Sequence, residues 1–566
     1  MYRKPAAPIG NRKNTACTLI LVLLLACSTG SGIGVLQGCA CQRSPHHPML
    51  DGSHYLSDPG GNSLPHDPEL RARAQAILAD AGHQSVRALD IIVPFDGAVF
   101  PKDMASPEIS WNDGSPTSTQ WLVVLSAAGK DGMAFCVTDR TRWTPPQQVW
   151  EWLKKRSASA PIIVSIYGTS PGADQLVHSQ ASIQVTISPD EVGAPLFFQH
   201  MPLPFRFAKN NPQLSSWFIG DISSYDQPRE VMSGLPMCGN CHAFSPDGST
   251  MGMDMDLDGD KGAYFLSSIR TGLEVTRDKF ISWNHDRTDI DSDSMGLFSR
   301  ISPDNSTVIS TVQETSFFAT IPDIDYSQFF FPIKGKLACY DRRRERFALL
   351  PGADLSDWVQ TSPAWHPDGK TIVFARAPVN EKLLAMVDDK GAFTREPDER
   401  IDDLNRKYRI HYDLYTIPFN RGKGGTATPL PGASNNGKSN YFPRYSPDGR
   451  WIVFTQSDTG LAIQPSSKLV IIPAAGGRPR VLSSNMEAMN SWHSWSPNGK
   501  WVVFSSKALS PYTQLFLTHI DEVGNGSVPV RLSRFNGITH ACLVPEFVNI
   551  EPGQFPDMRI VDLSAK

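Results

Sequence analysis

Tyr445-Ser-Pro-Asp-Gly-Arg-Trp-Ile-Val-Phe454 is the stretch that decides the fold, because the chain repeats it. Four further copies begin at Phe244, Ile301, Trp365 and Trp495. Each copy holds a proline that presets φ at a turn, and a Gly or Asn two residues later that accepts a positive φ. An apolar strand follows each turn. The sequence therefore predicts a series of β-hairpins.

Two more strands follow most copies, which makes four strands per unit. The repeat prolines stand at positions 246, 303, 367, 447, 497 and 545, the last in a degenerate copy, Cys542–Phe547. No strand pair follows that copy, but Trp217–Ile222 and Glu230–Met232 precede the first copy and can supply its outer strands. Four-stranded units at this spacing predict a ring that closes on a blade of mixed origin.

These repeats resemble the TolB-type β-propeller repeat, a relative of WD40 blades, over roughly residues 210–550. The resemblance implies a TolB-like propeller, and the six repeat positions predict six blades, which we place at 206–555. It also implies a platform that binds a protein or a ligand.

The segments before the propeller differ in character. Residues 87–205 contain five or more short alternating strands, with Trp111 early in the segment, and resemble a fibronectin III-like β-sandwich. Residues 28–86 are expected to form a flexible stalk, rich in Pro, His, Gly and Ser, followed by a short helix that starts at Asp67-Pro68. The predicted fold class is all-β.

The N-terminus predicts export. A basic stretch precedes the apolar segment Thr18–Ala26, which has the length of a signal-peptide core. Leu24-Leu-Ala-Cys27 resembles a bacterial lipobox, so residues 1–27 are interpreted as a signal peptide with Cys27 as the lipid attachment site. Cys39, an uncleaved membrane anchor and simple secretion remain alternatives. We expect a membrane-anchored lipoprotein of the cell envelope that faces the periplasm or the exterior.

Charge and cysteine content narrow the classes of function. The 566 residues carry a formal net charge of −4 and no basic block, so we expect no nucleic-acid partner. Four of the nine cysteines lie in the first 41 residues, and the other five are too unevenly spaced for a disulfide framework. Cys136, Cys339 and Cys542 are expected to be buried as small apolar residues.

Cys238-Gly-Asn-Cys241-His242 is the strongest chemical signal in the chain. Two thiols at this spacing can add to the vinyl groups of one haem, and the adjacent imidazole can bind its iron. We therefore predict covalent haem c on Cys238 and Cys241, with His242 as the proximal ligand. The motif resembles that of exported propellers in which Phe-Ser and Met-Gly-Met-Asp follow. A local disulfide and a zinc site are the alternatives.

Two weaker sites follow from the pattern. His493 occupies in its repeat the place that His242 occupies in the first copy, so it is a candidate distal iron ligand, with methionines, His540 or an open position as alternatives. Asp254, Asp256 and Asp258 alternate as in the first half of a calcium-binding loop, although Phe265 stands where the loop's closing Glu belongs.

Three classes of function fit these observations. The first is a haem protein for electron transfer or redox sensing, whose partner is a redox protein or another envelope protein. The second is a TolB-like binding platform without a redox role. The third is a haem-dependent enzyme of peroxide type, although the chain offers no catalytic residue that favours an enzyme.

Overall fold

The computed structural model of the chain describes residues 53–57, 68–81, 87–130, 132–158, 160–171, 176–269, 272–284, 294–387, 392–395, 398–561 and 563. The predictions for Cys27 and for most of the stalk lie outside this part of the chain. No helix within the described ranges is long and apolar enough to cross a membrane.

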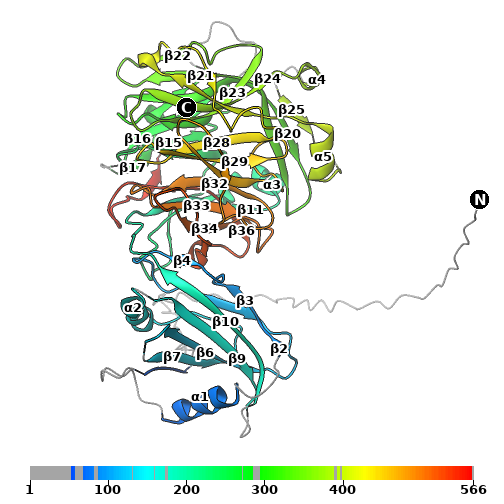
Figure 1. The fold of residues 1–566 in the computed structure, drawn as a ribbon. Coiled ribbons are helices and arrows are strands. Elements are labelled where there is room, and N and C mark those ends of the chain that lie inside the picture. Colours follow the sequence, from blue (N-terminus) through cyan, green and yellow to red (C-terminus); the bar gives the residue numbers. More distant parts are fainter. Residues whose placement is uncertain are drawn as a thin grey trace, which may run out of the picture. The chain divides into compact units, whose positions relative to one another are not determined.

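Two sheets build the region before the propeller (Figure 1). The larger runs in the order β1 (Ser53–Ser57), β7 (Met133–Thr138), β6 (Gln120–Ala127), β9 (Ile162–Thr169), β10 (Val177–Ile187) and β2 (Arg87–Ala88), and β4 (Val99–Phe100) also pairs with β10. The smaller runs β3 (Asp90–Val93), β5 (Ile109–Asn112) and β8 (Arg142–Trp143). Trp111 and Val164 share a core that joins the two sheets. Helix α1 (Pro68–Asp80) packs its apolar side chains against Leu122 and Val124, and α2 (Gln147–Arg156) contributes Trp150 to the shared core.

Five further sheets contain the repeats. One joins β14 (Gly239–Phe244), β15 (Thr250–Met255), β16 (Ala263–Ser268) and β18 (Phe280–Ser282). A nine-stranded sheet contains β19 (Leu297–Ile301), β20 (Thr307–Thr320), β21 (Gln328–Asp341) and β22 (Arg346–Leu349), then β23 (Trp358–Trp365), β24 (Thr371–Pro378), β26 (Asp413–Pro418) and β27 (Thr428–Pro429), with β25 (Ala392–Arg395) paired to β20. The next sheet joins β28 (Ser439–Tyr445), β29 (Trp451–Ser457), β30 (Lys468–Pro473) and β31 (Arg480–Val481). The sheet after it joins β32 (Asn490–Trp495), β33 (Trp501–Ser506), β34 (Gln514–His519) and β35 (Val530–Arg531).

The last sheet closes the ring. It runs β36 (His540–Phe547), β11 (Leu196–Pro202), β12 (Ser216–Gly220) and β13 (Arg229–Ser233), so it has the predicted mixed origin. One detail differs from our expectation. We placed Leu196–Pro202 in the sandwich and expected the strand near Trp217 directly beside the last copy, whereas β11 lies between them. Alternation of apolar residues predicts a strand but does not specify its partner.

The first strands of successive sheets line the centre of the ring. They contact one another in the order β14, β19, β23, β28, β32 and β36, and β36 in turn contacts β14. The described repeats therefore form a closed β-propeller.

A β-bulge recurs in these inner strands. Phe298, Ser362, Phe442 and Trp492 each stand five residues before a repeat proline and have φ between 48° and 60°. Val544 has φ 48° at the corresponding bulge of β36. Asn549, and not Pro545 as we expected, therefore takes the place of the repeat proline in the last copy. The last copy therefore aligns with the other repeats four residues later along the chain than we expected.

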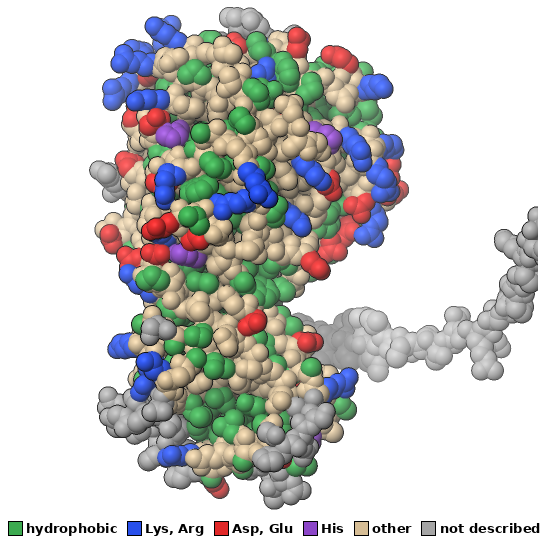
Figure 2. Space-filling view, in the orientation of Figure 1, with side chains coloured by type: hydrophobic (Ala, Val, Ile, Leu, Met, Phe, Trp, Pro, Cys, Tyr) green, Lys and Arg blue, Asp and Glu red, His purple; other side chains and the backbone are tan. Residues whose placement is uncertain are grey.

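The two regions share apolar contacts. Side chains of β33 and β34, among them Trp501 and Leu515, belong to the same buried cluster as Trp111 and Trp150. Arg531 forms an ion pair with Glu108, with 3.3 Å between Nη1 and Oε1. On the face drawn in Figure 2, cationic and anionic side chains are interspersed over the propeller.

Candidate functional site

The cysteine motif lies at the start of the innermost strand of the first repeat. Cys238 directly precedes β14, and the bulge of this strand falls between Gly239 and His242. Cys241 stands five residues before Pro246, so it occupies the position that Phe298, Phe442 and Trp492 occupy in other repeats. Cys241 and Trp492 both pack against the buried cluster that contains Phe298 and Phe442.

Phe298, Phe442 and Trp492 form what we term the channel plug. The ring centroids of Phe298 and Phe442 lie 5.0 Å apart, and those of Phe442 and Trp492 lie 4.8 Å apart. Because the three side chains come from β19, β28 and β32, the plug spans the centre of the ring. The thiol of Cys241 therefore borders an aromatic surface.

Both thiols of the motif are free. Burial raises the pKa of Cys241 to about 12, with a smaller contribution from Asp254. Burial also raises the pKa of Cys238. The two side chains are therefore protonated thiols at neutral pH.

The imidazole of His242 is buried and poorly hydrogen-bonded. Its side chain is 1% exposed and packs edge-on against Phe197 of β11, with 4.6 Å between the ring centroids. Neither ring nitrogen forms a hydrogen bond of ordinary geometry, and the nearest hydrogen-bonding group is the backbone of Val544, which raises the pKa of the ring by less than burial lowers it. Burial lowers the pKa of His242 to about 4, so the ring is neutral at pH 7. A neutral imidazole with an available nitrogen is the form that binds a metal.

The donor set fits a covalently attached haem in residue type and in protonation state. Cys241 packs against the apolar cluster that includes Phe298 and Phe442, whereas the ring of His242 packs against Phe197. Among the described residues, no three His, Cys, Asp or Glu side chains converge as the ligands of a metal ion. Haem attachment would therefore require the aromatic side chains around the motif to repack.

His493 is buried at the corresponding position of β32, but it has a backbone partner. Its Nε2 lies 3.0 Å from the carbonyl oxygen of Val453 on β29. Burial lowers the pKa of His493 to about 4. Arg300 and Glu546 influence the pKa values of both His493 and His242, so the two rings flank the same part of the channel. The structure gives His493 a role in the backbone network and shows no contact with His242.

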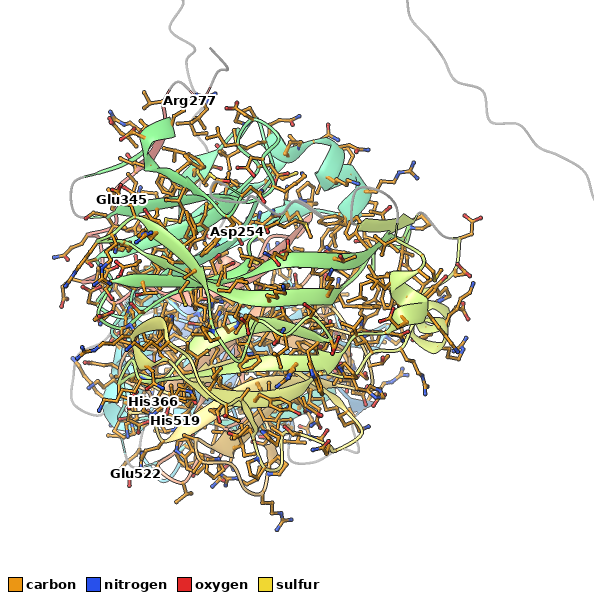
Figure 3. All side chains as sticks on the ribbon, turned by 90° about the horizontal axis from the view of Figure 1, so that it is seen from above. Asp254, Arg277, Glu345, His366, His519 and Glu522 are labelled. Carbon is orange, nitrogen blue, oxygen red and sulfur yellow. The ribbon has the colours of Figure 1, made fainter. Side chains whose placement is uncertain are left out.

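The three aspartates of the candidate calcium loop have separate partners. Asp254 accepts a hydrogen bond from the hydroxyl of Ser299 at 3.3 Å, and burial raises its pKa well above the ordinary value. Asp256 pairs with Lys261, and Asp258 pairs with Arg277. In Figure 3, Asp254 lies inward of the edge at which Arg277 is labelled. The structure does not bring these carboxylates together.

Three charged side chains that the sequence analysis missed meet in the channel. Arg300 of β19 and Arg444 of β28 both contact Oε1 of Glu546 on β36, at 3.1 and 2.7 Å. We term these residues the channel triad. Arg300 and Arg444 both stand three residues before a repeat proline, so the alignment of the repeats could have placed them together. Glu546 did not align with the two arginines, because we had aligned the last copy on Pro545 instead of Asn549.

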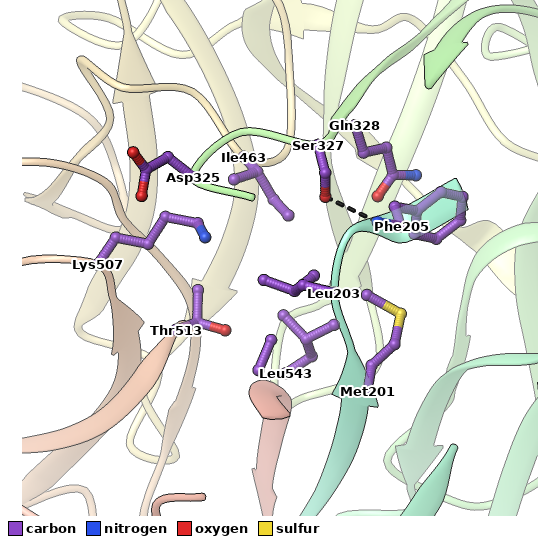
Figure 4. Close-up of a pocket in the computed structure, with 11 residues that line it drawn as sticks. Met201, Leu203, Phe205, Asp325, Ser327, Gln328, Ile463, Lys507, Thr513 and Leu543 are labelled. Carbon is purple, nitrogen blue, oxygen red and sulfur yellow. Dashed lines mark hydrogen bonds between the residues drawn. The ribbon is translucent and has the colours of Figure 1, made fainter. Parts of the chain in front are cut away.

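A pocket opens at the end of the channel where the inner strands begin. Met201, Leu203 and Leu543 form an apolar wall, and Lys507 and Asp325 lie across from it (Figure 4). The ammonium group of Lys507 donates to the carbonyl of Pro511. Burial lowers the pKa of Lys507 to about 8. The pocket therefore combines an apolar wall with one poorly hydrated amine.

The chain matches no protein-family model and no curated protein sequence. Among solved structures, TolB from Acinetobacter baumannii is similar at 13% identity, with a TM-score of 0.38 over 69% of this chain and 79% of that chain. A putative TolB from Agrobacterium tumefaciens is similar at 15% identity, with a TM-score of 0.33 over 60% and 88%. An oligogalacturonate lyase from Vibrio parahaemolyticus is similar at 11% identity, with a TM-score of 0.33 over 55% and 69%.

Proposed function

We propose that this protein is an envelope-anchored propeller that carries one covalent c-type haem and works in electron transfer or redox sensing. The observation that carries the proposal is the imidazole of His242, which is buried and neutral and forms no hydrogen bond of ordinary geometry, with only the backbone of Val544 near enough to act as a weak partner. A buried polar group left unpaired costs about 1–3 kcal/mol, so an orphaned imidazole beside two free thiols favours a missing ligand. When bound, a c-type haem supplies reversible transfer of one electron.

The architecture of the proposal follows from strand order. We infer six blades, because six innermost strands contact one another around the ring. We infer a fibronectin III-like fold for the preceding domain. Its smaller sheet joins β3, β5 and β8, and the core of its larger sheet joins β7, β6, β9 and β10, as in the two sheets of that fold. Lipidation of Cys27 supplies the anchor in this proposal.

The haem assignment is tested by a pyridine haemochrome spectrum and the intact mass of the protein made in a host that attaches haem c. We expect one haem per chain, and none in the Cys238→Ser/Cys241→Ser variant. Cys339→Ser is the matched control, because Cys339 is also a buried free thiol but lies outside the motif. A haem-free protein in which Cys238 and Cys241 form a disulfide would refute the assignment.

The pocket beside Lys507 favours a second candidate, a binding platform without a redox role. The cavity itself has room for only about 10 Å³ and also contains Asp325, so what it offers a partner is a shallow docking point at which one acidic group could reach Lys507. This alternative predicts a haem-free protein that binds an acidic envelope peptide. Lys507→Met should then weaken binding, and exposed Lys468→Met should not. Equal binding by both variants would reject the pocket as the site.

A further inference from the structure

The channel triad carries an excess of positive charge. Two guanidinium groups share one carboxylate, and both contact the same oxygen, Oε1 of Glu546. Nη1 of Arg300 also donates to the carbonyl of His242 at 3.2 Å. Asp254 lies nearby, and burial raises its pKa well above the ordinary value, which favours its neutral form. The triad therefore has a net charge of about +1 at neutral pH.

The triad is partly accessible to solvent, and its two arginines lie close along the chain to the aromatic residues of the channel plug. The side chains of Arg300, Arg444 and Glu546 are 15%, 18% and 13% exposed, so water reaches them. Phe298 and Phe442 of the channel plug stand two residues before Arg300 and Arg444 on the same strands. Arginine donors next to aromatic rings complement a carboxylate attached to a flat apolar group.

We propose that Arg300 and Arg444 form a binding site in the central channel for a carboxylate carried on a flat apolar body. Two sources share this chemistry. The first is a propionate of the haem attached at Cys241, and this source rests on the proposed function. The second is a free aromatic carboxylate.

Benzoate tests the site itself. It is titrated calorimetrically into full-length Cys238→Ser/Cys241→Ser protein, to which no haem can attach. Arg300→Gln and Arg444→Gln should each weaken binding about tenfold or more, because each removes a charge-assisted hydrogen bond. Arg300→Lys and Arg444→Lys should retain most of the affinity. Arg376→Gln is the control, because Arg376 is also a largely buried arginine of a blade strand, β24, but stacks on Trp358 at 4.0 Å, outside the triad.

The reduction potential of the haem-bearing protein identifies the source. If a propionate occupies the site, both Gln variants should lower the potential, since a positive charge near the haem favours electron uptake, and both Lys variants should preserve it. An unchanged potential together with arginine-dependent benzoate binding assigns the site to free carboxylates. The proposal is overturned if neither property changes, or if Arg376→Gln changes them equally. A protein without haem refutes the proposed function, whereas the benzoate titration still decides this site.

Discussion

The first and fifth repeats each place a histidine at the same position of the innermost strand, but the two rings differ in their hydrogen bonding. His242 on β14 and His493 on β32 are both buried, and burial lowers the pKa of each to about 4. Nε2 of His493 bonds the carbonyl of Val453 and its Nδ1 is unpaired, whereas neither nitrogen of His242 forms a hydrogen bond of ordinary geometry. The difference teaches that the repeat can bury a histidine as an ordinary structural residue. The unpaired nitrogens and the neighbouring thiols, not burial, make His242 a functional candidate.

Glu546 is a charged residue that lies near both histidines. Removing its charge should lower the free energy of unfolding more than the other changes described below. Glu546→Gln leaves Arg300 and Arg444 facing each other without their carboxylate. Loss of one partner of a buried ion pair costs about 3 kcal/mol at the low end, which suits the partial exposure of these side chains. Urea denaturation measures the loss. Glu551→Gln at an exposed position is the control, and an equally small effect of both substitutions would show that the triad is not a structural link.

The repeats could be predicted from the sequence because they depend on local residue order, and their regular spacing predicted a ring closed by strands of mixed origin, whereas the covalent haem stays a prediction. Ser-Pro-Asp-Gly specifies a turn wherever it occurs. The place of β11 depended on a partner more than 300 residues away along the chain, and no local pattern encodes that pairing. The difference between His242 and His493 was equally hidden, because it depends on whether a carbonyl of the neighbouring strand reaches the ring.

The titration of His493 should give the second largest effect. The unfolded chain binds a proton on this residue near pH 6.5, whereas the folded chain binds it near pH 4. The unfolded state therefore holds more protons between these values, and stability falls as the pH falls. This group alone should cost about 2 kcal/mol between about pH 7.5 and about pH 5.

The control for this titration is His493→Leu, whose free energy of unfolding should depend less on pH over the same window. Asp254 contributes in the opposite direction. Its raised pKa stabilises the folded state at low pH, and that stability is lost as the pH rises. The comparison of the two proteins cancels this contribution. Parallel pH profiles would contradict the buried, neutral state of His493.

The smallest expected effect is the difference in stability between two variants in which one or the other histidine is replaced. In the Cys238→Ser/Cys241→Ser background, where haem attachment cannot differ, each histidine is replaced by Leu, which has a similar volume. His493→Leu removes the bond to Val453 and leaves that carbonyl with one partner fewer, so it should destabilise the fold by about 1 kcal/mol or more. His242→Leu breaks no hydrogen bond and replaces an unpaired polar ring beside Phe197, so the free energy of unfolding should stay the same or rise. Chemical denaturation of both variants measures the difference. Equal losses would mean that His242 has a structural partner as His493 does, and the argument for an iron ligand at this position would then rest on the cysteine spacing alone.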